Sequence, residues 1–125
     1  YLYPDTYNFY VGGDVTLAFN SMLSNFSSKV YENEDIIAFK DINPMAPIHI
    51  LVTPKAHVLA DASEVTPDNS AIIAKCFEAI AVIAEQLGLK SGFRVINNCG
   101  PDGGQTIPHL HFHLLAGEKL PEKLV

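Results

Sequence analysis

Apolar residues recur along this chain with two different periods, and each period predicts a different kind of element. Stretches that alternate apolar and polar residues, and short stretches that are continuously apolar, predict β-strands. The stretch 48–53 is almost wholly apolar apart from His49, as expected of a central strand, and Pro54 ends it. The stretches that predict strands are 28–32, 35–42, 48–53, 93–97 and 107–115.

Helical spacing predicts two helices. The shorter one begins at Asp14 and runs to about Asn25. The longer one has Thr66 as its N-cap and Pro67 as its first helical residue, and Gly88 ends it. Its apolar stripe is made of residues at helical spacing: Ile73, Cys76, Phe77, Ile80, Ala84 and Leu87.

The longer helix carries more apolar surface than one sheet needs to cover it. Val82 lies among charged residues on the side opposite the stripe, and Ile72 and Ala79 flank the stripe. We therefore predict that this helix also packs in a homodimer interface.

The order of the elements is helix, three strands, helix and two strands, which favours an α+β fold with an antiparallel sheet covered on one face. A chain of 125 residues is expected to form one domain with a real core. Residues 1–14 are rich in tyrosine and show no clean period, so we interpret them as an N-terminal extension and 15–125 as the domain.

Composition narrows the classes of function. A net charge of −6 argues against broad nucleic-acid binding, and no apolar run approaches the length of a membrane span. Cys76 and Cys99 form no Cys-x-x-Cys pair, so neither a structural zinc site nor a disulfide framework is predicted. We expect a cytoplasmic protein, with the nucleus as a second compartment. Because the chain begins with Tyr1 instead of Met, we also expect that its start has been trimmed.

Three histidines alternate with apolar residues within 107–115. On a strand, His109, His111 and His113 would share one face, while Leu110 and Phe112 would face the other. The preceding stretch, 97–106, contains glycines and small polar residues that suit a turn with backbone amides close to an anion.

Three interpretations are compatible with this face. Packed or surface histidines are common singly, but three on one face are unusual. A metal site is disfavoured because His109 and His113 would lie roughly 13 Å apart along a strand, and no carboxylate or thiolate has supporting spacing. The third interpretation is nucleophilic and acid–base chemistry on a phosphate, because a neutral imidazole attacks phosphorus and titrates near neutral pH. This third interpretation accounts for both the three histidines and the glycine-rich stretch before them. We therefore predict no metal and no cofactor.

These residues resemble the histidine triad family, whose signature is His-Φ-His-Φ-His-Φ-Φ with Φ apolar. The segments that carry the resemblance to its Hint (protein kinase C interacting) branch are 39–44, 46–49, 54–57 and 102–106 in addition to 107–115. The resemblance runs from about Phe19 to Gly117. It implies a HIT-like fold with a five-stranded antiparallel sheet and two helices, assembled as a two-fold dimer with a continuous sheet.

The resemblance also implies an activity, the hydrolysis of purine nucleoside phosphoramidates of the AMP type through a covalent nucleotidyl-histidine. It makes His111 the nucleophile, with His49, His109 and His113 orienting it and managing protons. It implies nucleotide contacts for a wider set: Phe19, Met22, Phe39, Asp41, Ile42, Asn98, Gly104, Gln105 and Thr106. Among these, Asp41 would hold the ribose hydroxyls, and Phe39 and Ile42 have a core role as an equal alternative.

Alternatives and departures remain beside this interpretation. A nucleotide-binding regulatory module with incidental hydrolysis, a Fhit-like dinucleoside polyphosphate hydrolase and a metal-dependent hydrolase are the other hypotheses. A histidine at position 113 favours hydrolases, since the nucleotidyl transferases of this superfamily carry glutamine there. The tail lacks the tryptophan of many relatives, which leaves the amine specificity open.

Overall fold

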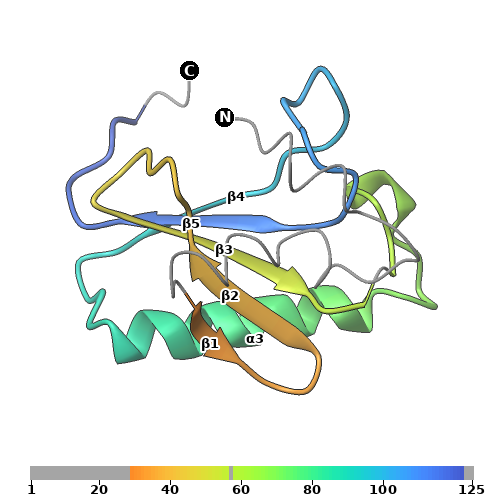
Figure 1. Cartoon of the computed structure of the whole chain (residues 1–125), viewed down its shortest axis with the longest axis horizontal. Helices are drawn as coiled ribbons and strands as arrows, with labels where there is room; N and C mark the ends of the chain where they lie inside the picture. Colours follow the sequence, from red (N-terminus) through yellow and green to blue (C-terminus); the bar gives the residue numbers. More distant parts are fainter. Residues whose placement is uncertain (1–28, 57, 123–125) are drawn as a thin grey trace.

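Five antiparallel strands form a single sheet in this protein, a computed structural model of which describes residues 29–56 and 58–122. Their order across the sheet is β1-β2-β3-β5-β4 (Figure 1). The predicted antiparallel sheet of five strands is thus confirmed. The predicted helix at 14–25 and the extension 1–14 lie outside the described residues. The strands are β1 (Lys29–Glu32), β2 (Ile36–Lys40), β3 (Ile48–Pro54), β4 (Arg94–Ile96) and β5 (Phe112–Ala116).

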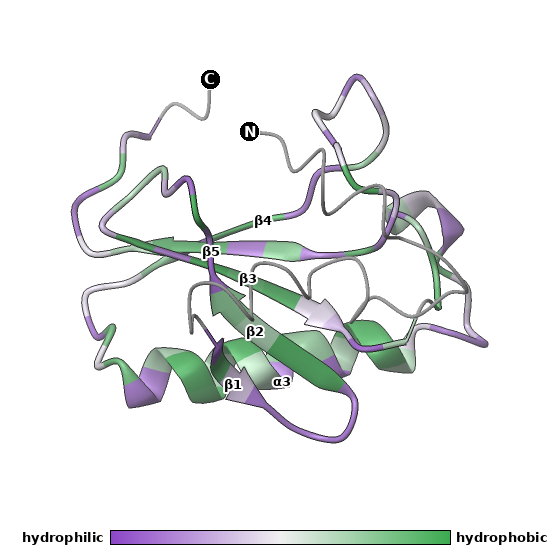
Figure 2. Cartoon of the chain, in the orientation of Figure 1, coloured by the Kyte–Doolittle hydropathy of each residue, from purple (hydrophilic) through white to green (hydrophobic). Residues whose placement is uncertain are grey.

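Helix α3 (Ala71–Gln86) covers one face of the sheet (Figure 1). Within the described part of the chain, no helix is long and apolar enough to cross a membrane. The core between helix and sheet is apolar, and Figure 2 shows the matching hydrophobic colouring along β2 and β3. The sheet contributes alternate residues to this core, and α3 contributes its buried face: Ile36, Ala38, Ile50, Val52, Phe112 and Leu114 from the sheet, and Cys76, Ala79, Ile80 and Ile83 from the helix.

The start predicted for this helix was wrong, whereas its end was confirmed. Thr66 and Pro67 precede the helix, and the carbonyl oxygen of Thr66 accepts the backbone N–H groups of Asn69 and Ser70 in a separate turn. The helix itself begins at Ala71. At the other end, Gly88 has a φ of +67°, the left-handed conformation that glycine adopts without steric cost.

The predicted apolar stripe was partly wrong, because the buried face of α3 is rotated toward Ala79 and Ile83. Ile83 is fully buried, whereas Phe77 is 48% exposed and Leu87 is 43% exposed. Phe77 still contacts the core at its edge, where its ring centroid lies 5.2 Å from that of Phe112. The exposed part of the stripe therefore forms an apolar surface on the described monomer.

The last predicted strand was too long. Only Phe112–Ala116 pairs as β5, so His109 and His111 lie in an approach segment before the strand. The N–H of Leu110 donates to the carbonyl of Leu59, and the N–H of His109 donates to the carbonyl of Ile107. These bonds use donors that a β-ladder would need, so this segment does not continue the strand.

Candidate functional site

Two histidines meet on the sheet face opposite α3. His113 on β5 is paired in register with Leu51 of β3, and His49 lies two residues earlier on β3 and on the same face. The Nε2 of His49 lies 2.9 Å from the Nδ1 of His113. Both residues are buried. Antiparallel pairing therefore places one predicted site histidine directly beside another.

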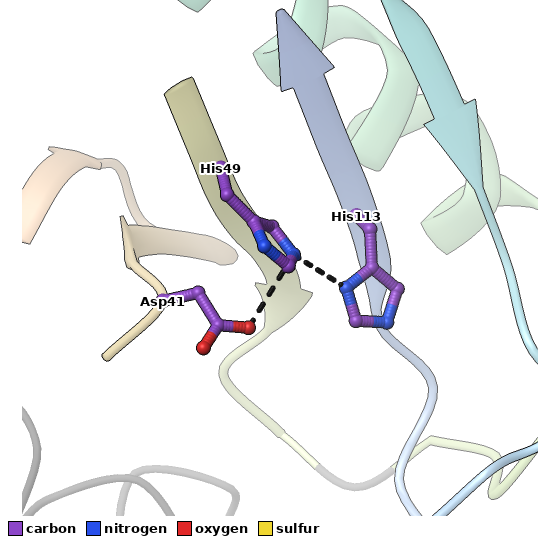
Figure 3. Close-up of side chains that lie close together, drawn as sticks. All are labelled: Asp41, His49 and His113. Carbon is purple, nitrogen blue, oxygen red and sulfur yellow. Dashed lines mark hydrogen bonds and ion pairs between the residues drawn. The ribbon is translucent and has the colours of Figure 1, made fainter. Parts of the chain in front are cut away.

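Asp41 extends this pair. It follows β2 directly, and its backbone N–H donates to the carbonyl of His49 across the β2–β3 connection. Its Oδ2 lies 3.3 Å from the Nε2 of His49, while its Oδ1 accepts the backbone N–H of Asn43 at 2.8 Å. The Asp41 side chain is fully buried. Figure 3 shows the resulting row of Asp41, His49 and His113.

His111 is held by its own segment. Its Nδ1 lies 2.7 Å from the carbonyl oxygen of His109, and a carbonyl can only accept a hydrogen bond. Nδ1 therefore carries the proton in the neutral ring, and Nε2 carries the lone pair. The ring lies edge-on to His113, with 5.2 Å between their centroids. His111 is thus in the tautomer that a nucleophilic Nε2 requires.

His109 anchors the segment that carries the nucleophile candidate. Its Nε2 lies 3.0 Å from the carbonyl oxygen of Pro54, at the end of β3, and the residue has no exposed surface. Beside it, the hydroxyl of Thr53 donates to the carbonyl of Leu110 at 2.8 Å. Both bonds tie the approach segment to β3, so His109 acts on the position of His111.

Burial keeps these imidazoles neutral. Burial lowers the pKa of His111 and of His49, and for His49 the nearby Asp41 carboxylate opposes this shift without reversing it. Burial also lowers the pKa of His113, to about 4. Three neutral rings at pH 7 can offer one lone pair and one N–H each, which suits nucleophilic attack and hydrogen bonding to a phosphate.

The loop between β4 and β5 is shaped by side chains predicted to contact phosphate. Gln105 accepts the N–H of Gly100 and donates to the carbonyls of Ala60 and Ile107. Asn98 donates to the carbonyl of Gly103 at 2.6 Å. Both side chains therefore bind the protein backbone, which positions the loop, and their contact with a phosphate stays a prediction.

Two glycines of this loop lie where a larger side chain would be strained or would clash with the backbone. Gly104 has a φ of +82°, and a Cβ on Gly103 would lie 2.4 Å from the carbonyl oxygen of Cys99. The buried hydroxyl of Thr106 makes no hydrogen bond within the described residues. A buried hydroxyl without a partner is costly, so this group is a candidate for binding a ligand.

The residues predicted to form the base slot are only partly described. Phe39 on β2 has no exposed surface, and Ile42 beyond it is 39% exposed. Phe19 and Met22 lie outside the described residues. Contact of any of these four with a nucleotide base stays a prediction.

The prediction that no carboxylate supports the histidines was wrong. Ligand atoms of Asp41, His49 and His113 lie within 4.8 Å of one another, a spacing that a metal ion could bridge. However, the backbone N–H of Met45 donates to the Nδ1 of His49 at 3.0 Å. That bond places the ring proton on Nε2, the atom a metal would need. The hydrogen bonds of this row therefore fit a metal poorly.

The Asp41–His49 contact is the part of the site that the sequence analysis missed. The resemblance implies a ribose contact for Asp41 and a place beside the triad for His49, and no local pattern joins these two residues. The usable signal was the pairing of β2 with β3, because Asp41 directly follows β2 and His49 is the second residue of β3.

The chain is similar to known proteins in both sequence and structure. The HIT domain family model matches residues 23–120. An uncharacterised HIT-like protein of Synechococcus elongatus is 45% identical over 73% of this chain and 79% of its own length. A solved histidine triad protein from Clostridium difficile is 47% identical, with a TM-score of 0.74, covering 77% of this chain and 84% of the other.

A HIT family hydrolase from Clostridium thermocellum has a TM-score of 0.80 and 39% identity, covering 92% of this chain and 99% of that one. A 14 kDa zinc-binding protein of Zea mays is 41% identical over 75% of this chain and 74% of its own length. The chain is therefore similar to proteins of this kind over most of its length.

Proposed function

Because the chain belongs to the HIT domain family, and its solved relatives include a hydrolase, we propose that it hydrolyses purine nucleoside phosphoramidates. The proposed reaction breaks a P–N bond through a covalent nucleotidyl group on His111. The observation that carries this proposal is the hydrogen bond from the Nδ1 of His111 to the carbonyl of His109. This bond leaves the lone pair on Nε2. Burial lowers the pKa of His111, so the ring stays neutral and the lone pair stays available.

The proposed chemistry has two steps. In the first, the Nε2 of His111 attacks the α-phosphorus and forms a P–N bond, the bond to the amine breaks, and the leaving nitrogen takes up a proton. In the second, water attacks the same phosphorus, releases the Nε2 of His111 and loses a proton. One water is consumed overall, and the products are a nucleoside monophosphate and an amine.

The surroundings of His111 support this proposal. A buried site strengthens hydrogen bonds to the charge that develops on phosphoryl oxygens. The N–H of His113 and the hydroxyl of Thr106 are donors of the required kind, whereas the amides of Gly100, Gly103 and Gly104 already donate within the loop. A ligand of the AMP type fits the proposal, and Asn98, Gly104 and Gln105 remain proposed contacts of its phosphate.

A homodimer is part of this proposal. Apolar side chains are exposed at separate positions on α3 and between α3 and the edge strand β4: Phe77 and Val82 on the helix, and Leu87 and Phe93 after it. Strand β4 lies at the edge of the sheet, so its outer side has no neighbouring strand within the described residues. A second copy of the chain that pairs with this edge would extend the sheet and cover apolar side chains beside it.

A metal-dependent hydrolase is the second candidate. The cluster of Asp41, His49 and His113 favours it, as does the zinc-binding relative from Zea mays. The hydrogen bond from the Met45 amide to His49 argues against it, because it removes the lone pair from Nε2. Chelation would abolish a metal-dependent activity and leave the covalent mechanism unchanged.

The test uses an adenosine phosphoramidate with a fluorogenic amine. We expect turnover by the wild type, loss of turnover in His111→Ala by roughly four orders of magnitude or more, and a transient adduct in rapid-quench intact-mass spectra. Asp102→Asn, a change at an exposed position of the same loop, is the matched control and should retain activity. Tight AMP binding without turnover by the wild type would instead support the binding module, and full turnover by His111→Ala would exclude the proposed nucleophile.

A further inference from the structure

We propose that Asp41 is a positioning residue that sets the tautomers of His49 and His113, so that His113 presents its Nε2–H on the side away from His49. The order of the hydrogen bonds follows from the geometry of the described residues. Its consequence for catalysis rests on the function proposed above.

The first step is set by the backbone of Met45. Its N–H can only donate, and it lies 3.0 Å from the Nδ1 of His49. The Nδ1 therefore accepts, and the neutral ring carries its proton on Nε2. The pKa of His49 is lowered by burial, so the neutral ring is the relevant form at pH 7.

The second step is the carboxylate of Asp41. An ionised carboxylate can only accept, and Oδ2 lies 3.3 Å from the Nε2 of His49. The bond from the N–H of Asn43 to Oδ1 holds the carboxylate in this orientation. Oδ2 makes no hydrogen bond within the described residues, so Asp41 stabilises the proton on Nε2 by its charge alone, while Met45 excludes that proton from Nδ1.

The third step passes this order to His113. With its proton on Nε2, His49 donates to the Nδ1 of His113 over 2.9 Å. A neutral His113 then carries its own proton on Nε2, the ring nitrogen that points away from His49 in Figure 3. That N–H can donate to a phosphoryl oxygen beside His111, whose ring centroid lies 5.2 Å away. The proposal requires no proton transfer within the row.

This role differs from contact with the ribose. A carboxylate that holds ribose hydroxyls binds the ground state and the transition state alike, so its loss raises KM. A carboxylate that orients His113 acts on a bond to the developing charge, so its loss lowers kcat. Carboxylates that orient metal-binding histidines contribute about 10–100-fold, and we expect an effect of this size for Asp41.

The first test needs no substrate. Long-range ¹H–¹⁵N spectra of histidine-labelled wild-type protein report which nitrogen of each ring carries a proton. We expect His49 and His113 as Nε2–H tautomers and His111 as the Nδ1–H tautomer. A proton on the Nδ1 of His49 or of His113 in the wild type would overturn the proposal, whatever the activity proves to be.

The variant Asp41→Asn tests the cause. Its amide can present an N–H where Oδ2 now lies, which opposes the proton on Nε2 and leaves the Met45 N–H as the one group that still opposes a proton on Nδ1. We expect the His49 and His113 signals to move toward the other tautomer, while Asp35→Asn, which removes an exposed carboxylate paired with Lys75, leaves them unchanged. Unchanged tautomers in a folded Asp41→Asn protein would refute the role of Asp41, and if this variant fails to fold, the wild-type spectrum still decides the hydrogen-bond order.

Steady-state kinetics distinguish a positioning role of Asp41 from a role in binding the ribose. We expect Asp41→Asn to lower kcat about 10–100-fold with KM changed less than threefold. The same loss should appear with a 2′,3′-dideoxyadenosine phosphoramidate, which lacks the ribose hydroxyls. A loss confined to the ribose substrate and to KM would overturn the proposal. One-to-one Zn²⁺ binding by the wild type that shifts the His49 and His113 signals would overturn it in favour of a metal site.

Discussion

The Nδ1 of His111 lies 2.7 Å from the carbonyl oxygen of His109, two residues earlier in the same segment. This contact is possible because the chain at 107–111 is not part of the sheet ladder, so that carbonyl is available to the ring. The proton of the nucleophile candidate is thereby positioned by local backbone, whereas those of His49 and His113 depend on partners elsewhere in the chain. The site thus combines one locally determined tautomer with two that depend on the fold.

The acid limb of activity should lie below pH 6.5. Only neutral His111 carries a lone pair on Nε2, and burial lowers its pKa, so protonation sets in at a lower pH than for a free imidazole. We expect kcat/KM to stay constant as the pH falls through 6.5 and to decline below it. Direct titration of His111 by NMR is the control, and an inflection at or above 6.5 assigned to this ring would contradict the prediction.

Stability should fall between pH 6.5 and about 4. The pKa of His113 is lowered from 6.5 to about 4 in the folded protein, so the unfolded state binds more protons in this window. The contribution is fully present above pH 6.5 and is lost as the pH falls, by about 3 kcal/mol for a shift of this size. Urea unfolding at pH 7.5 and at 4.5 measures it. The variant His113→Gln should show a smaller loss over the same range, and an identical loss would mean that other groups cause it.

Gln105→Ala should loosen the loop before β5. The change removes one acceptor and two donors, and leaves the carbonyl of Ile107 without the Gln105 amide as a donor. We expect a loss of about 1–3 kcal/mol in the free energy of unfolding and a lower kcat/KM. Chemical denaturation and the phosphoramidate assay measure the two effects. Asp102→Ala, at an exposed position of the same loop, should change neither by a comparable amount.

Val82→Arg should separate the proposed dimer. Val82 is 39% exposed on α3, so a charge there costs little in the monomer but a great deal in an apolar interface. We expect sedimentation to show a dimer for the wild type and a monomer for the variant at micromolar concentration, with an unchanged circular dichroism spectrum. Glu34→Arg, at an exposed position between β1 and β2, is the control. A wild-type monomer under these conditions would remove the dimer from the proposal.

The sequence by itself determined which segments form the sheet, where α3 ends and which histidines belong together. Local patterns carry this information, because the alternation of side chains on a strand and the left-handed conformation at Gly88 depend on neighbouring residues alone. The predicted start of α3 failed for a local reason as well. Thr66 and Pro67 suit both a helix start and an isolated turn, and residues 66–70 form the turn.

Only the tertiary structure decided the chemistry of the individual rings. The partner of each ring nitrogen comes from a different place: the Met45 amide for His49, the carbonyl of Pro54 for His109, and His49 itself for His113. No periodicity encodes these contacts, because those of His109 and His113 join segments far apart in the chain and that of His49 depends on the turn before β3. A histidine's tautomer follows from these contacts, and its protonation state depends in addition on its burial. The residue types at the site were therefore visible in the sequence, while their protons were positioned by the fold.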